Sequence, residues 1–240
     1  MNPPAAICFD FWNTLVVEPG GMLSALRREA VVRTLLEHDV EVEEDVLDAH
    51  LAAAQALQSA AWQRGKRFTP SKAAQHVAGS IEGLGGDGRG RLMEAYLEAG
   101  REAELTLTPN AGETLAALAG AGVQLGIVCD VGLTGSAHLR AFLDRSGVLR
   151  HFRGWAFSDE VGHFKPSPLI FRHMTDQLRL AAEDPVWHVG DLRRTDVAGA
   201  RRSGLVPIRY RGMADDRSDA PDADRVIDDL AELIDFASPR

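Results

Sequence analysis

The fold is decided by the segment Ala5-Ala6-Ile7-Cys8-Phe9-Asp10-Phe11-Trp12-Asn13-Thr14-Leu15. Its first five residues form an apolar run that stops at Asp10, as in a fully buried parallel strand that reaches the open end of a sheet. Polar, turn-forming residues follow. We therefore predict a central parallel strand with a carboxylate at its end.

Strand-like and helix-like segments alternate in the second half of the chain. Apolar strands are predicted at residues 123–129, 155–157, 185–189 and 206–210. One helix is predicted to begin at Thr108-Pro109, before the first of these strands, and another at Ser167-Pro168, since proline suits the first helical turn. A further helix ends near Ser203-Gly204. This alternation predicts an α/β fold with a Rossmann-like, doubly wound parallel sheet. The Asp-rich stretch 213–224 is predicted to be a mobile surface loop.

Residues 21–105 have a helical pattern instead. Leucine and valine recur at helical spacing from Leu23 to Leu36, and Thr69-Pro70 is typical of a helix start. The glycine-rich stretch 83–90 separates a further helix. We predict an α/β core formed by residues 1–20 and 106–240, with residues 21–105 inserted as a helical domain.

The overall composition excludes several classes of protein. The 240 residues carry a formal net charge of -9, which argues against a nucleic-acid partner. No apolar run approaches the roughly 20 residues of a membrane helix, and no signal peptide is recognisable, so we expect a cytoplasmic protein without a membrane partner. Only Cys8 and Cys129 are present, too few for a disulfide framework.

Acidic residues follow several predicted strands. In a doubly wound sheet, ligands bind beyond the carboxyl ends of the strands, so Asp10, Asp130, Asp159 and Asp191 should converge there. Asp191 and Asp196, five residues apart, suit a hard cation such as Mg²⁺. Asp196 is equally open to interpretation as a helix N-cap, and Asp10 as a metal ligand or a turn cap.

Lys165, in the segment Val161-Gly162-His163-Phe164-Lys165-Pro166-Ser167-Pro168, has two interpretations. A fixed ammonium there would neutralise both a phosphate and a nucleophilic carboxylate. A lysine before a proline is otherwise typical of a solvated surface group.

Taken together, three motifs resemble those of the haloacid dehalogenase-like hydrolase superfamily over nearly the whole chain. The first is Asp10 with Thr14-Leu15, and the third is Lys165-Pro166 preceded by residues 158–162. The fourth is Gly190-Asp191 with Asp196 and Gly199-Ala200. The resemblance implies that residues 21–105 form the cap that closes over the site and selects substrates.

The resemblance also implies a mechanism and a cofactor. Asp10 would attack phosphorus to give an aspartyl-phosphate, and Lys165 would balance the charge. Mg²⁺ would be held by Asp10, the main-chain carbonyl of Trp12 and Asp191, with Asp196 supporting through water. The expected substrate is a small phosphorylated metabolite of unspecified identity, and the oligomeric state is not predicted.

The chain departs from the superfamily pattern at Trp12. Phosphatases of this class carry a second aspartate at that position, two residues after the nucleophile, which protonates the leaving group. An indole cannot do this, and the loss is worth a factor of about 10² to 10⁴ in rate. Candidate replacements are Asp130, Glu18 and His163.

The second motif is altered as well. Cys129 stands where the superfamily has a phosphate-binding serine or threonine, and Asp130 follows it. A thiol is a weak hydrogen-bond donor, and Thr134 is a candidate for the missing hydroxyl. His188, on a predicted buried strand, is expected to be a hydrogen-bonded core histidine rather than a ligand.

These departures keep two other functions open. Haloacid dehalogenases proper have an aromatic residue at the position of Trp12 and work without a metal, although they typically lack the acidic pair of the fourth motif. A binding module with weakened catalysis would retain Mg²⁺ and phosphate. Arg27, Arg28 and Arg33 are candidates to contact an anionic substrate, or belong to a solvated helix face.

Overall fold

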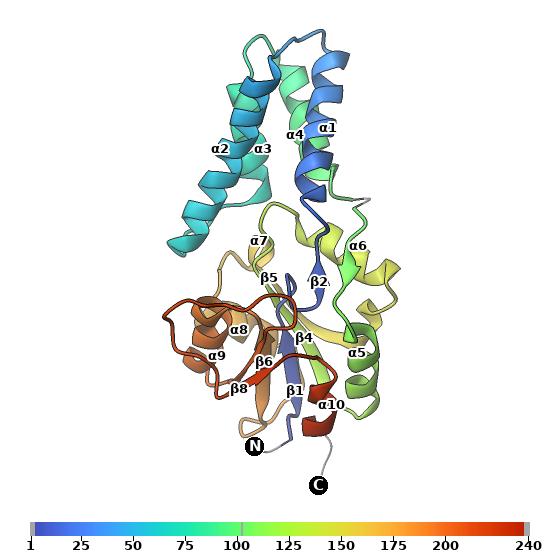
Figure 1. Ribbon diagram of the computed structural model, residues 1–240, viewed down its shortest axis with the longest axis vertical. Coiled ribbons are helices and arrows are strands. Elements are labelled where there is room, and N and C mark those ends of the chain that lie inside the picture. The colour runs from blue at the N-terminus through green and yellow to red at the C-terminus, as the bar shows by residue number, and fades with distance from the viewer. Residues whose placement is uncertain (1–2, 102, 238–240) are drawn as a thin grey trace. The chain divides into compact units, whose positions relative to one another are not determined.

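The computed structural model describes residues 3–101 and 103–237, and its central feature is a six-stranded parallel sheet (Figure 1). The strands lie in the order β5-β4-β1-β6-β7-β8. Their bounds are β1 Ala6–Phe9, β4 Gln124–Cys129, β5 Phe152–Phe157, β6 Val186–Gly190, β7 Val206–Tyr210 and β8 Arg225–Ile227.

The strand that precedes Asp10 lies at the centre of this sheet. All four residues of β1 are buried, and it pairs with β4 on one side and β6 on the other. The ladder continues one residue further, where the Asp10 amide donates to the Val189 carbonyl over 2.8 Å. The parallel register brings the ends of β1, β4 and β6 to one edge, which confirms the predicted doubly wound α/β sheet.

Helices cover both faces of the sheet. Apolar residues of α8 pack with β1, β4 and β5, while α5 and α10 contact each other away from α8 (Figure 1). The helical elements are α5 Ala111–Gly120, α6 Ser136–Arg145, η1 Leu149–His151, α7 Ser158–Val161, α8 Pro168–Thr175, η2 Arg193–Val197, α9 Ala198–Arg202 and α10 Glu232–Ala237. The predicted start at Ser167-Pro168 is confirmed, since the Ser167 hydroxyl caps α8.

A second compact unit contains residues 18–104 and 131–142. Its helices are α1 Met22–Glu37, α2 Glu44–Gln63, α3 Pro70–Ser80 and α4 Gly86–Glu98, and most of α6 also belongs to it. They share a core of small and aliphatic side chains, including Val31, Ala74 and Leu92. The Thr69 hydroxyl caps α3 as its sequence predicts, by accepting from the Lys72 amide. We refer to this part as the helical unit and to the remainder as the sheet unit.

The helix predicted to begin at Thr108-Pro109 begins instead at Ala111. The Thr108 hydroxyl donates to the Thr14 carbonyl over 2.7 Å, so it ties two segments of the sheet unit together rather than capping a helix. Just before it, β3 (Thr106–Leu107) pairs with β2 (Val16–Val17) in a short antiparallel ribbon that the sequence did not predict. In the described part of the chain, no helix is both long and apolar enough to cross a membrane.

The segment predicted to be a mobile surface loop is fastened by ion pairs. Arg209, at the end of β7, forms two hydrogen bonds with Asp222, at 2.6 and 3.0 Å, and one with Asp215 at 2.8 Å. Arg193 adds a second ion pair with Asp222 at 3.0 Å. The loop is therefore surface-lying but anchored, and its mobility stays a prediction.

Candidate active site

Three carboxylates meet at the carboxyl edge of the sheet. Asp10 follows β1, Asp191 follows β6, and Asp196 lies in η2. One oxygen from each lies within 4.8 Å of the other two. Asp10 and Asp191 are 5% exposed and Asp196 is 1% exposed. The prediction from strand ends named Asp10, Asp130, Asp159 and Asp191. Of these, Asp10 and Asp191 belong to the cluster, and Asp196 joins them from η2.

Lys165 is buried among these carboxylates. Its Nζ donates to Asp10 and, over 2.7 Å, to Asp196, and the residue is 3% exposed. Burial alone would lower the pKa of Lys165, but the charges of Asp10 and Asp196 outweigh it and raise the pKa well above its usual range. Lys165 is therefore a fixed ammonium, and the interpretation as a solvated surface lysine is wrong.

Asp196 is surrounded by protein donors. Oδ1 accepts from Lys165 and from His188 Nε2 at 2.8 Å, and Oδ2 accepts from the Leu192 amide and the Thr195 hydroxyl, both at 3.2 Å. Burial alone would raise its pKa, but the charge of Lys165 and the bond from His188 hold the pKa well below its usual range. Asp196 lies inside η2 rather than at a helix N-cap, so it anchors Lys165.

Asp10 and Asp191 have too few cationic partners in the described part of the protein to be fully ionised without a further cation. Among the described residues, no donor side chain is paired with the Asp191 carboxylate. Burial, followed by the charges of Asp10 and Asp196, raises the pKa of Asp191 to about 8, and burial raises the pKa of Asp10 to about 7. One ammonium faces three carboxylates, so an oxygen-preferring divalent cation fits this set of donors.

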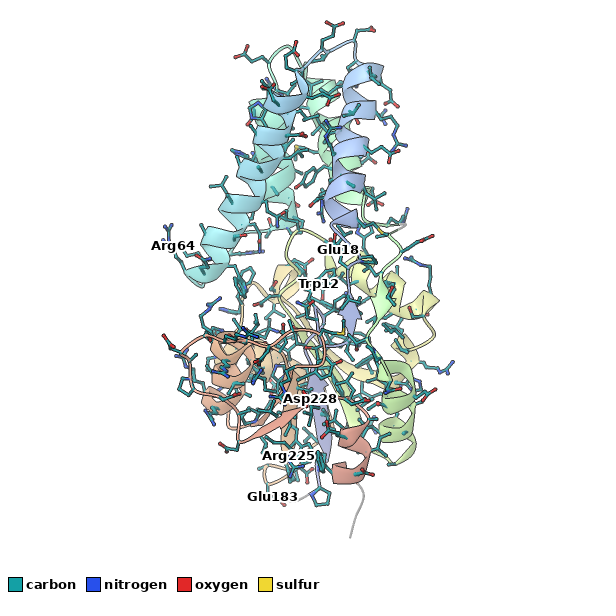
Figure 2. All side chains as sticks on the ribbon, in the orientation of Figure 1. Trp12, Glu18, Arg64, Glu183, Arg225 and Asp228 are labelled. Carbon is teal, nitrogen blue, oxygen red and sulfur yellow. The ribbon has the colours of Figure 1, made fainter. Side chains whose placement is uncertain are left out.

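The turn after β1 carries Trp12. The Phe11 carbonyl accepts from the amides of Leu15 and Val16, and the Asn13 amide donates to the Val16 carbonyl. None of these bonds uses the Trp12 carbonyl. Its indole is half-buried, packs edge-on against Phe11 with ring centres 5.0 Å apart, and lies in the turn that follows β1 (Figure 2). The position of the usual acid therefore holds only an aromatic ring.

The other residues predicted to bind phosphate lie close to Asp10 or Lys165. The Thr14 hydroxyl is 3.4 Å from Asp10 Oδ2, a long hydrogen bond, and Asp130 Oδ1 accepts from the Lys165 amide at 3.1 Å. Cys129 is fully buried at the end of β4. Burial, and then the charge of Asp10, raises its pKa well above the usual range, so it is a neutral thiol rather than a nucleophilic thiolate.

Glu18 and His163, the candidates to replace the missing acid, and Thr134, the candidate hydroxyl, form no hydrogen bond with the acid cluster in the described part of the chain. Glu18 Oε1 accepts from the Leu23 amide at 2.7 Å at the start of α1 (Figure 2). Thr134 accepts from Arg27 within the helical unit, and His163 is exposed in the loop before Lys165. The Glu18 and Thr134 side chains are thus already engaged in the helical unit.

His188 is the residue whose contact the sequence missed. The prediction of a buried, hydrogen-bonded histidine is confirmed: it is 1% exposed and packs edge-on against Phe171. Its partner, however, is Asp196. The sequence offered one signal, because His188 lies on a predicted strand, three residues before Asp191. The structure adds that the β1–β6 register places His188 beside Cys8, whose Sγ is 3.2 Å from Nδ1.

A family model described as haloacid dehalogenase-like hydrolase matches residues 4–204. The chain belongs to this family. It is therefore a haloacid dehalogenase-like hydrolase, and the sheet, the acid cluster and Lys165 described above are the features by which its sequence resembled that family.

Two relatives of this haloacid dehalogenase-like hydrolase are named as phosphatases. The chain is 30% identical over 237 residues to a glyceraldehyde 3-phosphate phosphatase of Methanopyrus kandleri, covering 96% of this chain and 95% of the relative. It is 34% identical over 155 residues to a ribulose-1,5-bisphosphate 5-phosphatase of Halopiger xanaduensis, covering 61% and 63%. Both relatives are named for phosphorylated small molecules.

Solved structures with the same fold include a hydrolase described as bound to magnesium and a 2-haloacid dehalogenase. The hydrolase YfnB of Bacillus subtilis, described as bound to magnesium, has a TM-score of 0.67 at 18% identity, covering 98% of both chains. A 2-haloacid dehalogenase of Pseudomonas syringae has a TM-score of 0.70 at 20% identity, covering 96% of both. At this identity the likeness establishes the fold alone.

Proposed function

We propose that this hydrolase is a Mg²⁺-dependent phosphatase that acts on a small phosphorylated metabolite through an aspartyl-phosphate at Asp10. The observation that carries the proposal is the buried Asp10 carboxylate bonded to Lys165, beside Asp191 and Asp196. The phosphatase names of two relatives support the same reaction class.

In this proposal Asp10, Asp191 and the main-chain carbonyl of Trp12 would hold Mg²⁺. Asp196 would support the cation through water. The Asp196 oxygens are already occupied by protein donors, which suits a supporting role rather than direct contact. When bound, the cation would neutralise the phosphate and the excess carboxylates.

The reaction has two steps. An oxygen of Asp10 forms a bond to phosphorus while the bond from phosphorus to the leaving oxygen breaks and its electron pair stays on that oxygen. Water then attacks the phosphorus of the aspartyl-phosphate and gives up a proton to solvent, while the bond between phosphorus and the Asp10 oxygen breaks. This releases inorganic phosphate and restores the Asp10 carboxylate. Lys165 remains protonated throughout, holding Asp10 in place and balancing charge.

We infer that Thr14, Cys129, Asp130 and Lys165 build the phosphate site. Lys165 supplies charge, the Thr14 hydroxyl donates, and the neutral Cys129 thiol donates only weakly. Asp130 contributes by holding the Lys165 amide rather than by touching phosphate. We assign residues 21–105 as the cap that selects the substrate.

Trp12 sets the expected substrate preference. Because the indole cannot protonate a leaving oxygen, the leaving group takes its proton from solvent, and a poor leaving group slows the first step. Loss of general acid catalysis reduces rates by about 10² to 10⁴. Acyl and aryl phosphates, which leave readily without a proton, should therefore react faster than alkyl phosphates.

Trp12 also favours a second candidate, a 2-haloacid dehalogenase, because displacement of halide from carbon needs no proton for the leaving group. In that reaction Asp10 would attack carbon, and Mg²⁺ would have no role. Turnover of 2-chloropropionate in excess chelator would support this candidate and contradict the phosphatase.

The deciding experiment measures phosphate release from p-nitrophenyl phosphate and from a panel of alkyl phosphates, with Mg²⁺ or chelator. Wild type, Asp10→Asn and Trp12→Asp are compared, with Trp12→Phe as the control that keeps an aromatic ring. We expect activity that requires Mg²⁺ and Asp10, and a gain on alkyl phosphates only in Trp12→Asp. Absence of release by all four proteins on every ester would overturn the proposal.

A further inference from the structure

The described part of the helical unit contains a buried cation without an acidic partner. Arg27, in α1, is 6% exposed. Its neighbours in the same helix behave differently, since Arg28 pairs with Asp48 at 2.7 Å and Arg33 with Glu29 at 3.8 Å, all with exposed side chains. Among the described residues Arg27 forms no such ion pair.

Two residues from other segments surround the Arg27 guanidinium. One of its nitrogens donates to the Thr134 hydroxyl over 2.7 Å, and its carbon lies 5.7 Å from the centre of the Tyr96 ring. A guanidinium offers five N–H donors, and in the described part of the chain only this one bond uses them. Tyr96 is 2% exposed, and its hydroxyl has no protein partner there either.

This arrangement is costly for the protein by itself. A buried charge without a counter-ion destabilises a fold, and an arginine cannot escape by losing its proton. Burial lowers the pKa of Arg27, and the acidic residue whose charge it feels is Glu18. The Glu18 carboxylate, however, is engaged with the Leu23 amide at 2.7 Å. Among the described residues no acidic side chain is left to neutralise Arg27, so a small anion could serve as its counter-ion.

We propose that Arg27, Tyr96 and Thr134 form an oxyanion-binding site within the helical unit. A guanidinium matches two oxygens of a carboxylate or phosphate group at once, and the two hydroxyls add further donors. The ligand's chemistry is thus a planar or tetrahedral oxyanion. It has two sources, a second anionic group of the substrate or a separate small anion.

Direct binding tests the site without turnover. Malonate and inorganic phosphate are titrated calorimetrically into the metal-free protein in chelator, where no bound cation attracts anions to the acid cluster around Asp10. We expect saturable binding to wild type, at least about tenfold weaker binding to Arg27→Met, and partial retention in Arg27→Lys. Arg33→Met, whose side chain is 65% exposed, is the control and should bind like wild type.

The stability of the variants separates a binding role from a structural one. If Arg27 is held for a ligand, Arg27→Met without anion should be at least as stable as wild type in urea, because an unbalanced buried charge has been removed. Tyr96→Phe removes only a hydroxyl and should weaken anion binding with no change in fold. A strongly destabilised Arg27→Met together with full anion affinity in Tyr96→Phe would overturn the proposal.

Kinetics identify the source of the anion, and this part alone rests on the proposed function. If the substrate supplies it, Arg27→Met raises KM for phosphate esters that carry a second anionic group and leaves KM for phenyl phosphate unchanged. If a separate anion binds, added malonate changes the rate on both esters in wild type but not in Arg27→Met. If wild type binds neither malonate nor phosphate in the calorimeter, the proposed anion site is rejected, even if the phosphatase is active.

Discussion

His188 Nε2 lies 2.8 Å from Asp196 Oδ1, the same oxygen that accepts from Lys165. Burial lowers the pKa of His188, so its ring is neutral and, with a carboxylate as partner, carries its proton on Nε2. Nδ1 lies 3.2 Å from the Cys8 sulfur, and the Cys8 thiol also lies within donating distance, 3.4 Å, of the Trp187 carbonyl. Cys8, His188 and Asp196 thus form a buried chain that ends at the Lys165 ammonium.

Substitution of His188 should separate its hydrogen bond from its packing. Gln places an amide donor near the position of Nε2, whereas Leu fills the space without a donor. We expect His188→Leu to reduce kcat or the apparent Mg²⁺ affinity by about 10- to 100-fold, as for other residues that orient metal-site groups, and His188→Gln to retain most of both. Phosphate release and Mg²⁺-dependent thermal shifts measure these effects. Equal damage in the two variants would show a packing role only.

Lys165→Met should remove the only positive charge bonded to Asp10 in the described structure. Breaking a buried ion pair leaves uncompensated charge, which destabilises by roughly 3 to 5 kcal/mol, and we expect activity to fall at least about 100-fold. Urea unfolding in chelator and phosphate release measure the two effects. Lys72→Met, at an exposed position in α3, is the control. Wild-type stability in Lys165→Met would contradict the role of Lys165 as a clamp.

Short-range sequence patterns predicted the sheet and the convergence of Asp10 and Asp191, whereas the role of Lys165 was implied only by the resemblance to the family. Apolar runs identify strands, and parallel strand ends share an edge. The linkage of His188 with Asp196 was not predictable in the same way. It depends on how the η2 turn folds back towards β6, and strand periodicity does not report that.

Sequence patterns also could not predict whether an individual side chain is buried or which group it bonds to. Lys165 before a proline has the pattern of a surface residue, and only tertiary packing shows that it is buried. Thr108-Pro109 has the pattern of a helix start, but the bond from Thr108 to the Thr14 carbonyl decides the local structure. Arg27, Arg28 and Arg33 follow one another along a single helix, and packing alone distinguishes the buried one.

Gly190 is predicted to tolerate no side chain. A Cβ at this position would lie 2.3 Å from Asp196 Cγ, far inside contact distance. We expect Gly190→Ala to push Asp196 away from Lys165, to destabilise the fold by about 1 to 3 kcal/mol and to lower activity. The control is Gly79→Ala in α3, where nothing lies within 4 Å of the added atom, and which should be neutral or stabilising. Urea unfolding compares them, and unchanged stability and turnover in Gly190→Ala would contradict the close approach.

The metal-free protein should lose stability as pH rises. The pKa values of Asp10 and Asp191 are raised from 3.8 in the unfolded chain to about 7 and about 8 in the folded one. Between these limits the folded state binds more protons than the unfolded state, so the free energy of unfolding falls from about pH 4 to about pH 8. The lowered pKa of Asp196 makes the free energy of unfolding fall as the pH drops below about 4, which is outside this window.

Mg²⁺ should reverse this trend, because protons compete with the cation for the same oxygens and its apparent affinity therefore increases up to about pH 8. Urea unfolding at pH 5, 7 and 9, in chelator and in Mg²⁺, measures both effects. Asp191→Asn should flatten the slope in chelator and weaken the stabilisation by Mg²⁺, whereas Asp48→Asn, at an exposed position in α2, should change neither. A stability that rises with pH in chelator would mean that Asp10 and Asp191 are balanced by charges other than a bound cation.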